Sequence, residues 1–233
     1  MKVNLKVIDK NKNEKDAELS AFNKSLKTND PIHRNAEKIE SDELSPMDPP
    51  DAYDPERAVG KSIATHEYLK ALSLEHSEVL EHCKEFEKAL IDFKNGGYYI
   101  TKEINDAFNA FFVHMDDHVL PHNRKEEKGL FPVLHRRMLE TGEHSEGENP
   151  HTPIDLMEDE HVKFIQLTSL TFNFLGLAMR LKDPESRIIT LDIAYNKGME
   201  LVEILKLHIY REDNTIFPLA QKLLSVKELN ALT

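Results

Sequence analysis

The chain has 233 residues, of which 31% are charged and 39% are hydrophobic, and its formal net charge is -12 at pH 7. This acidic balance argues against a nucleic-acid partner, because no basic stripe is present to neutralise phosphates. No apolar run reaches the length of about eighteen residues that a membrane helix needs, so no membrane span is expected. The single cysteine, Cys83, excludes an internal disulfide framework. Together with an N-terminus that lacks the apolar core of a signal peptide, it favours the cytoplasm.

Residues 1–56 differ in composition from the rest of the chain. They are polar, lack helical periodicity, and end in an acidic stretch with several prolines between Ser41 and Pro55. So little apolar surface cannot offset the entropy of ordering the segment, and we expect a largely irregular arm or linker. An arm that packs on the remainder of the chain is the alternative. Residues 57–233 are expected to form one helical domain.

The first two helices of this domain are predicted from apolar residues that recur at helical spacing. The first runs from about Ser62 to the Asn95-Gly96-Gly97 turn, and the second begins near Thr101, a suitable N-cap. Pro121 should kink or interrupt the second helix, because it removes one backbone donor; the alternative is that it marks a helix boundary. The apolar stripe of the first helix contains Leu69, Leu72, Val79, Leu80, Cys83 and Phe86.

Two further helices follow a polar loop that runs from Thr141 to His151. The third is expected over about residues 153–181, with Phe164, Ile165 and Phe172 on its apolar stripe. The fourth, whose stripe includes Ile189, starts at Asp183-Pro184-Glu185, where an N-cap, a proline and an acid follow one another. Short loops between long amphipathic helices predict an all-α, up-down-up-down four-helix bundle. A short C-terminal helix, Pro218 to Leu224, is expected to cover one end.

One sequence motif occurs twice in the predicted bundle. Each copy has a Glu-His pair, then a His-x-x-x-Glu step, and closes with an aliphatic residue, Phe and Pro. The local match is HNRKEEKGLFPVL against HIYREDNTIFPLA. The first copy comprises Glu75-His76, His122, Glu126 and Leu130-Phe131-Pro132, and the second comprises Glu160-His161, His208, Glu212 and Ile216-Phe217-Pro218.

The spacing within each copy predicts a metal site. Residues four apart on a helix share a face, so His122 and Glu126 point the same way, as do the two residues of the second copy. These residues lie on apolar stripes, where a carboxylate is costly to bury unless it is paired or bound to metal. Four imidazoles and two carboxylates suit two oxo- or hydroxo-bridged iron ions, with zinc or manganese as alternatives. If both carboxylates bridge, coordination positions remain open for water or a small diatomic ligand.

Other polar residues near the motif are open to two interpretations. Glu127 and Asp213, five residues after the motif histidines, fall about 140° from them on an α-helix and are expected in solvent. His118, Glu75 and Glu160 are candidates for an extra ligand or for hydrogen bonds to the ligands, with solvent exposure as the alternative. Cys83 has no basic neighbour to activate it, so packing in the core is expected.

These motifs resemble the hemerythrin-like (HHE cation-binding) family over about residues 62–224. The resemblance is closest to the bacterial di-iron proteins that repair iron–sulfur clusters, through the stretch from Pro153 to His161. Oxygen-carrying hemerythrins have a His-x-x-x-His pair on the third helix and a final aspartate, whereas this chain has Ile165 and Glu212. The resemblance implies that the iron ligands are His76, His122, Glu126, His161, His208 and Glu212.

The resemblance implies a non-haem di-iron protein that binds or responds to O2, NO or redox state. The alternatives are an enzyme-like role in cluster repair or in peroxide or NO detoxification, and a metal-storage or structural role. The repair proteins share an N-terminal domain with adjacent cysteines, and the N-terminal part of this chain has none. Thiol-assisted repair is therefore in doubt. A protein partner is not indicated by any feature of the sequence.

Overall fold

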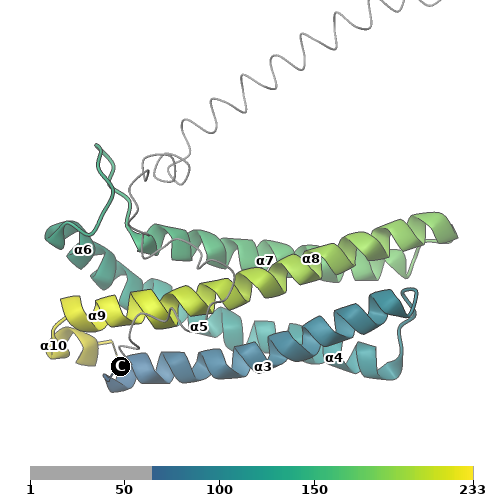
Figure 1. The fold of residues 1–233 in the computed structure, drawn as a ribbon, viewed down its shortest axis with the longest axis horizontal. Coiled ribbons are helices and arrows are strands. Elements are labelled where there is room, and N and C mark those ends of the chain that lie inside the picture. Colours follow the sequence, from purple (N-terminus) through teal and green to yellow (C-terminus); the bar gives the residue numbers. More distant parts are fainter. Residues whose placement is uncertain (1–64, 233) are drawn as a thin grey trace, which may run out of the picture. The chain divides into compact units, whose positions relative to one another are not determined.

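The computed structural model describes residues 65–232, and every regular element in this range is helical (Figure 1). The predicted all-α class is therefore confirmed. The predicted arm over residues 1–56 and the domain boundary at residue 57 lie outside the described range. None of the described helices is long and apolar enough to cross a membrane.

Four helical segments form the bundle, joined by turns and one longer loop. The first is α3 (Glu67–Asn95), the third is α7 (Pro153–Ala178), and a short helix, α10 (Val226–Asn230), follows the fourth. The second consists of α4 (Lys102–His114), η3 (Met115–Val119), α5 (Leu120–Lys125), η4 (Glu126–Leu130) and α6 (Phe131–Thr141). The fourth consists of α8 (Pro184–Arg211), η5 (Glu212–Ile216) and α9 (Phe217–Leu223).

The predicted helix starts are present with their caps. The Thr101 side chain accepts a hydrogen bond from the Ile104 N–H, and the Asp183 side chain accepts one from the Ser186 N–H. Thr152, which the sequence did not single out, forms a capping box with Asp155 before α7. Each side-chain oxygen satisfies a backbone donor that the first helical turn leaves unpaired.

Three π-helical turns, η3, η4 and η5, interrupt the second and fourth segments. Each ends two residues before a proline, namely Pro121, Pro132 or Pro218. The π pattern pairs a carbonyl with the N–H five residues on, and so leaves one carbonyl of the α pattern without a donor. A proline tolerates this position because it has no N–H to donate. The helix therefore passes Pro121 without ending, and the predicted interruption is a π turn directly before it.

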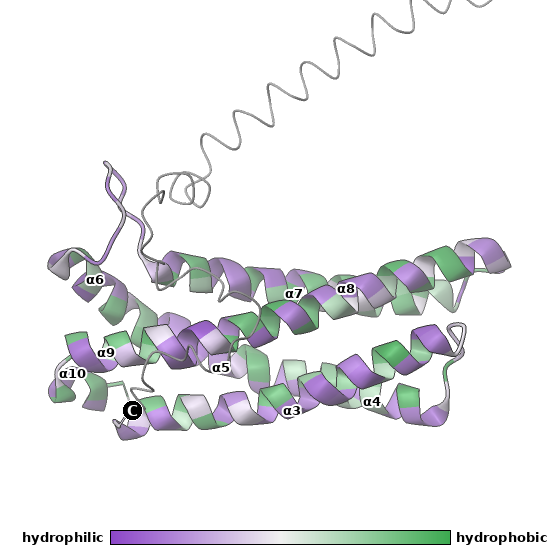
Figure 2. Cartoon of the chain, viewed as in Figure 1, coloured by the Kyte–Doolittle hydropathy of each residue, from purple (hydrophilic) through white to green (hydrophobic). Residues whose placement is uncertain are grey.

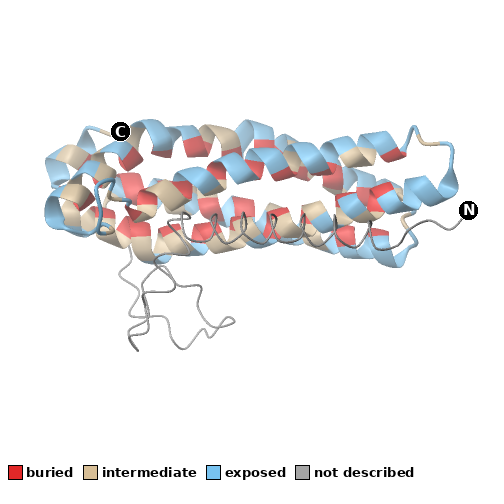
Figure 3. Ribbon diagram, turned by 90° about the horizontal axis from the view of Figure 1, so that it is seen from above, coloured by how far each residue is buried: buried red, intermediate tan, exposed pale blue. Residues whose placement is uncertain are grey.

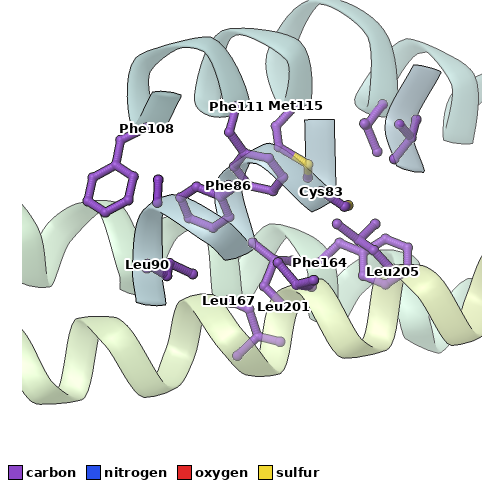
Figure 4. Close-up of a cluster of buried hydrophobic side chains, with 14 of the residues drawn as sticks. Cys83, Phe86, Leu90, Phe108, Phe111, Met115, Phe164, Leu167, Leu201 and Leu205 are labelled. Carbon is purple, nitrogen blue, oxygen red and sulfur yellow. The ribbon is translucent and has the colours of Figure 1, made fainter. Parts of the chain in front are cut away.

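The apolar core is divided into two clusters with a polar layer between them. One cluster contains Phe86, Phe111 and Phe164 (Figure 4), and the other contains Leu72 and Phe131. Figure 2 shows apolar residues spaced along each helix, and Figure 3 shows buried residues on the inner faces of the helices. The separate clusters hold the helices together at both ends of the polar layer, where each fully buried Leu or Phe contributes about 1.5–3 kcal/mol.

Some stripe residues were predicted wrongly. Leu80, Ile165, Phe172 and Ile189 are exposed, to between 37% and 62%, because the inward faces of the long helices are narrower than the stripes drawn from the sequence. The predicted short C-terminal helix from Pro218 to Leu224 is present as α9, Phe217–Leu223, which continues the fourth segment beyond η5. The separate short helix is α10, whose Leu229 packs in the second apolar cluster.

Candidate metal centre

The six motif residues predicted as ligands meet in the polar layer between the two apolar clusters. Every one is buried, and Glu126 and Glu212 have no exposed surface at all. Each glutamate is the first residue of a π turn, η4 or η5. The six residues are His76 on α3, His122 on α5, Glu126 on η4, His161 on α7, His208 on α8 and Glu212 on η5.

The ligand atoms form two groups that share both carboxylates. Glu126 and Glu212 combine with His76 and His122 in one group, and the same glutamates combine with the other two histidines in the second. Within each group the candidate ligand atoms lie within 4.8 Å of one another. Each group thus offers two imidazoles and two carboxylates, which are donors that a metal ion accepts.

The distances show how the carboxylates span the two halves. Glu126 places Oε1 3.4 Å from His122 Nε2 and Oε2 3.6 Å from His161 Nε2. Glu212 Oε2 lies 3.1 Å from His76 Nε2 and 3.2 Å from His208 Nε2. The ring nitrogens also pair, with Nε2 atoms 3.0 Å apart for His76 and His122 and 3.1 Å apart for the other two rings. Nitrogen lone pairs and carboxylate oxygens thus converge on one small volume.

Four outer carboxylates hold the four imidazoles through their Nδ1 atoms. Glu75 on α3 accepts from His122 at 2.8 Å, and Glu160 on α7 accepts from His208 at 2.9 Å. The remaining contacts are His161 to Glu127 of η4 and His76 to Asp213 of η5, both at 3.0 Å. Each of the four helical segments therefore supplies an acid to a histidine of the next, in a closed ring. An Nδ1–H held in this way leaves the Nε2 lone pair free for a metal.

The expectation that Glu127 and Asp213 lie in solvent holds only in part, because Glu127 is exposed and Asp213 is partly exposed, but both make a contact that the sequence did not predict. Their side chains are 41% and 29% exposed, yet each bonds a buried histidine of another helix. Their angle was taken relative to the histidine on their own helix, whereas Glu127 bonds His161 and Asp213 bonds His76, each on a neighbouring helix. The acid doublets Glu126-Glu127 and Glu212-Asp213, which recur in both copies, were the available signal.

The structure also explains the Phe of each motif. The Phe217 ring stacks on His76 with centroids 5.4 Å apart, and the Phe131 ring stacks on His161 with centroids 5.6 Å apart. In an α-helix, Phe131 would be rotated about 140° from Glu126. The π turn instead bonds the Phe131 N–H to the Glu126 carbonyl, so both residues face the site.

The outermost contacts differ between the two copies. Lys125 bonds Glu75 at 2.5 Å, and Arg211, at the matching place in the second copy, bonds Glu160. Arg211 and Glu160 are each 12% exposed, whereas Lys125 and Glu75 are 52% and 37% exposed. The Arg211–Glu160 pair of the second half is therefore more shielded from solvent than the Lys125–Glu75 pair of the first half, although Glu127, which bonds His161, is itself exposed.

Cation binding accounts for buried polar atoms that otherwise lack partners. Both side-chain oxygens of Glu126 and of Glu212 are buried without a hydrogen-bond donor. Burying a carboxylate without compensation costs several kcal/mol, so such groups in a native protein call for a specific partner. Four imidazole nitrogens and two carboxylates around one volume form the donor set that a pair of iron, manganese or zinc ions accepts, so the residues fit the predicted metal.

In the metal-free protein the crowded charges move the pKa values in opposite directions. Burial raises the pKa of Glu126, and the nearby charge of Glu212 raises it further. Burial also opposes ionisation of Glu212, but His208 and His76 outweigh it and hold its pKa well below the usual value. Burial disfavours protonation of His76 too, yet its contacts with Asp213 and Glu212 raise its pKa to about 10. A bound cation takes the place of these protons.

The other candidates lie outside both ligand groups. His118 is exposed, and its ring stacks on the buried His114 with centroids 4.7 Å apart. Cys83 is fully buried in the first apolar cluster, as expected, and burial raises the pKa of its thiol to about 12.

Comparison with known proteins adds one finding. A family model described as the hemerythrin HHE cation binding domain matches residues 67–220. Neither the curated proteins nor the solved structures contain a match to this chain. The matched range contains both copies of the motif, all six inner residues and all four outer acids.

Proposed function

Because this chain belongs to the hemerythrin family of HHE cation-binding domains, we propose that it is a non-haem di-iron protein that binds or responds to O2, NO or redox state. His76, His122, Glu126, His161, His208 and Glu212 would hold the two ions. The observation that carries the proposal is the pair of buried carboxylates shared by two pairs of histidines. A bound iron pair would supply reducing electrons and coordination positions for a diatomic ligand.

The protein's own residues would keep these positions available. Four histidine nitrogens, four carboxylate oxygens and a shared oxo or hydroxo group would leave two six-coordinate ions about two positions in total for other ligands. The outer acids hold each imidazole in one tautomer, so that a ligand's arrival does not reorient it. The apolar clusters on both sides of the polar layer limit bulk water. This combination favours reversible binding of a small molecule over turnover of a large organic substrate.

An enzyme-like role is the second candidate. The third-helix Glu160-His161 step and the final Glu212 resemble the cluster-repair branch of the family more than the oxygen carriers. That likeness supports reduction of NO or peroxide, or repair of iron–sulfur clusters, as the activity to test. A storage or structural metal bundle is the third candidate. Cytoplasmic location remains a proposal that rests on the single cysteine.

Metal content and the visible spectrum test the main proposal. Protein purified from iron-replete cells should contain about two irons per chain, with charge-transfer absorption that bleaches on reduction and responds to NO or O2. A colourless protein that holds zinc would contradict the redox proposal and support the structural role. Reduction of NO or peroxide at many turnovers per site would favour the enzyme.

A further inference from the structure

One cavity lies directly outside the first half of the candidate centre. It measures about 550 Å³ and is lined by residues of α3, of the α5–η4 region and of the chain after α10. Its lining includes Tyr68, Leu72, Glu75, Lys125, Lys128 and Gly129. The cavity thus begins at the solvated Lys125–Glu75 pair and not at the more shielded Arg211–Glu160 pair of the second half.

A single layer of side chains separates this cavity from the centre. Glu75, in its wall, accepts the hydrogen bond from His122 Nδ1 at 2.8 Å. Leu72, also in the wall, stands one helical turn before His76. Tyr68 lies near the inner carboxylate: burial raises its pKa to about 12, and the charge of Glu126 contributes to that rise. The wall therefore contacts His122 through Glu75, and Leu72 places it one helical turn from His76.

Gly129 and Tyr68 lie close together in the lining of the cavity. A Cβ atom on Gly129 would lie 3.2 Å from the hydroxyl oxygen of Tyr68, which is closer than ordinary van der Waals contact. The matching residue of the second copy is Thr215, at the same place in its own π turn, η5. The two copies share their inner ligands and outer acids but differ in the residue that faces this opening.

We propose that this cavity is the route by which small exogenous ligands, of the size of NO or azide, reach the centre, with the Lys125–Glu75 pair and the Tyr68–Gly129 contact as its gate. The inference rests on the proposed function, because it presumes metal at the site. Movement of the exposed Lys125 side chain opens the outer end. The Arg211–Glu160 pair is only 12% exposed, so we place the entry beside the more exposed Lys125–Glu75 pair, where the cavity lies.

Azide binding to the iron-loaded protein, followed by stopped-flow absorbance, tests the route. Gly129→Thr introduces at the gate the residue that the second copy has at the matching position. A π turn accommodates threonine there, because Thr215 occupies the same place in η5. We expect the association and dissociation rates to fall together by about tenfold, with an unchanged Kd and an unchanged spectrum, because a gate slows passage in both directions. Tyr68→Phe in the same chain removes the hydroxyl and should recover part of the rate.

The reverse exchange, Thr215→Gly, is the matched control. It should leave both azide rates as they are, because Thr215 does not line the cavity. Equal rates in the parent and Gly129→Thr, or a change in Kd with the association rate unaltered, would overturn the route. An increase with Thr215→Gly as large as the decrease with Gly129→Thr would also overturn it.

The uptake of Co(II) by the metal-free protein separates this inference from the proposed function. Cobalt absorbance should appear in the parent and in every variant if the centre binds metal. Failure of the parent to bind Co(II) or iron would refute the proposed function itself. Normal cobalt binding, combined with azide rates that are the same in the parent and the gate variants, would refute only the route.

Discussion

At the scale of single residues, the outer acids decide how the inner ligands are presented. An imidazole with a free Nδ1 can rotate and can carry its proton on either nitrogen, whereas one bonded to a carboxylate keeps a fixed tautomer. Asp213 does this for His76, although it is on a different helix and is partly exposed. The metal centre is therefore larger than its six inner residues.

Asp213→Asn is expected to weaken metal binding by roughly 10–100-fold, because an amide bonds the His76 ring less strongly and can favour the wrong tautomer. Competition between the protein and a coloured chelator for Co(II) measures the change. Asp117→Asn, at an exposed position on η3, is the control and should bind metal like the parent. Affinity unchanged by Asp213→Asn would mean that the contact does not orient the ring.

His114 makes a second residue-scale prediction, about pH. It is 5% exposed, its Nε2 has no partner, and its ring lies between His82 and His118. Burial, together with the charges of the two neighbouring histidines, lowers its pKa to about 4. The His114 ring is therefore protonated below about pH 6.5 in the unfolded chain but only below about pH 4 in the folded chain. The stability linked to His114 is present above pH 6.5 and is lost as the pH falls towards 4.

The acid limb is the fall in unfolding free energy between pH 6.5 and pH 4. His114→Leu should reduce this fall by up to about 3 kcal/mol, because the variant has no His114 ring to protonate. Urea unfolding across this range, on the parent and the variant, checks it. His144→Leu, on the exposed loop, should leave the limb as steep as in the parent. Parallel curves for the parent and His114→Leu would show that another group carries the acid sensitivity.

At the scale of helices, the packing of α3 against α8 requires a glycine. A Cβ atom at Gly198 would lie 2.9 Å from Leu90 Cδ1 and 3.1 Å from Leu90 Cδ2. Both residues are buried. The helix tolerates the entropic cost of glycine there because the two helices approach closely. At Gly176, near the end of α7, a Cβ would have no atom within 4 Å.

The two glycines should respond in opposite directions to the same substitution. Gly198→Ala is expected to destabilise the protein by about 1–3 kcal/mol, because the new methyl group forces Leu90 to move. Gly176→Ala should stabilise it by up to about 1 kcal/mol, because alanine is the better helix former and meets no obstacle. Chemical denaturation of both variants measures the difference. A Gly198→Ala variant as stable as the parent would show that Leu90 repacks freely.

At the scale of the whole molecule, the polar layer ties all four helical segments to one centre. Each segment supplies one or two inner residues and one outer acid, so the metal links helices that pack mainly through two separate clusters. Without a cation, the carboxylates of Glu126 and Glu212 are buried with no donor. The unfolded chain does not present the ligands together, so metal binding contributes directly to the free energy of folding.

Removal of the metal should therefore lower the stability of the whole bundle. At a free metal concentration near a thousand times the Kd, binding to the folded state contributes about 4 kcal/mol, so the Tm should fall by several degrees on chelation and recover on reloading. Differential scanning calorimetry of the metal-loaded and metal-free protein checks this. The double variant Glu126→Gln, Glu212→Gln should show no response to metal. Equal Tm values for the loaded and stripped parent would show that the layer is stable by itself.

The sequence alone determined the helical class, the starts of the second and fourth helical segments and the six residues that meet in the polar layer. These follow from local rules: apolar residues at helical spacing, capping residues such as Thr101 and Asp183, and a duplicated His-x-x-x-Glu step whose members share one face of a helix. Their identity as metal ligands stays a prediction, now with a compatible geometry.

Only the tertiary structure decided which acid bonds which histidine and which of the two outer ion pairs is more exposed to solvent. Asp213 and Glu127 act across helices, and the angle along a single helix cannot reveal a partner on another. The π turns depend on where Pro132 and Pro218 fall relative to the buried Glu126 and Glu212. The difference between the exposed Lys125–Glu75 pair and the more shielded Arg211–Glu160 pair arises from what packs outside them. Two nearly identical sequence motifs thus form two unequal halves of one centre, because burial is a property of the surroundings.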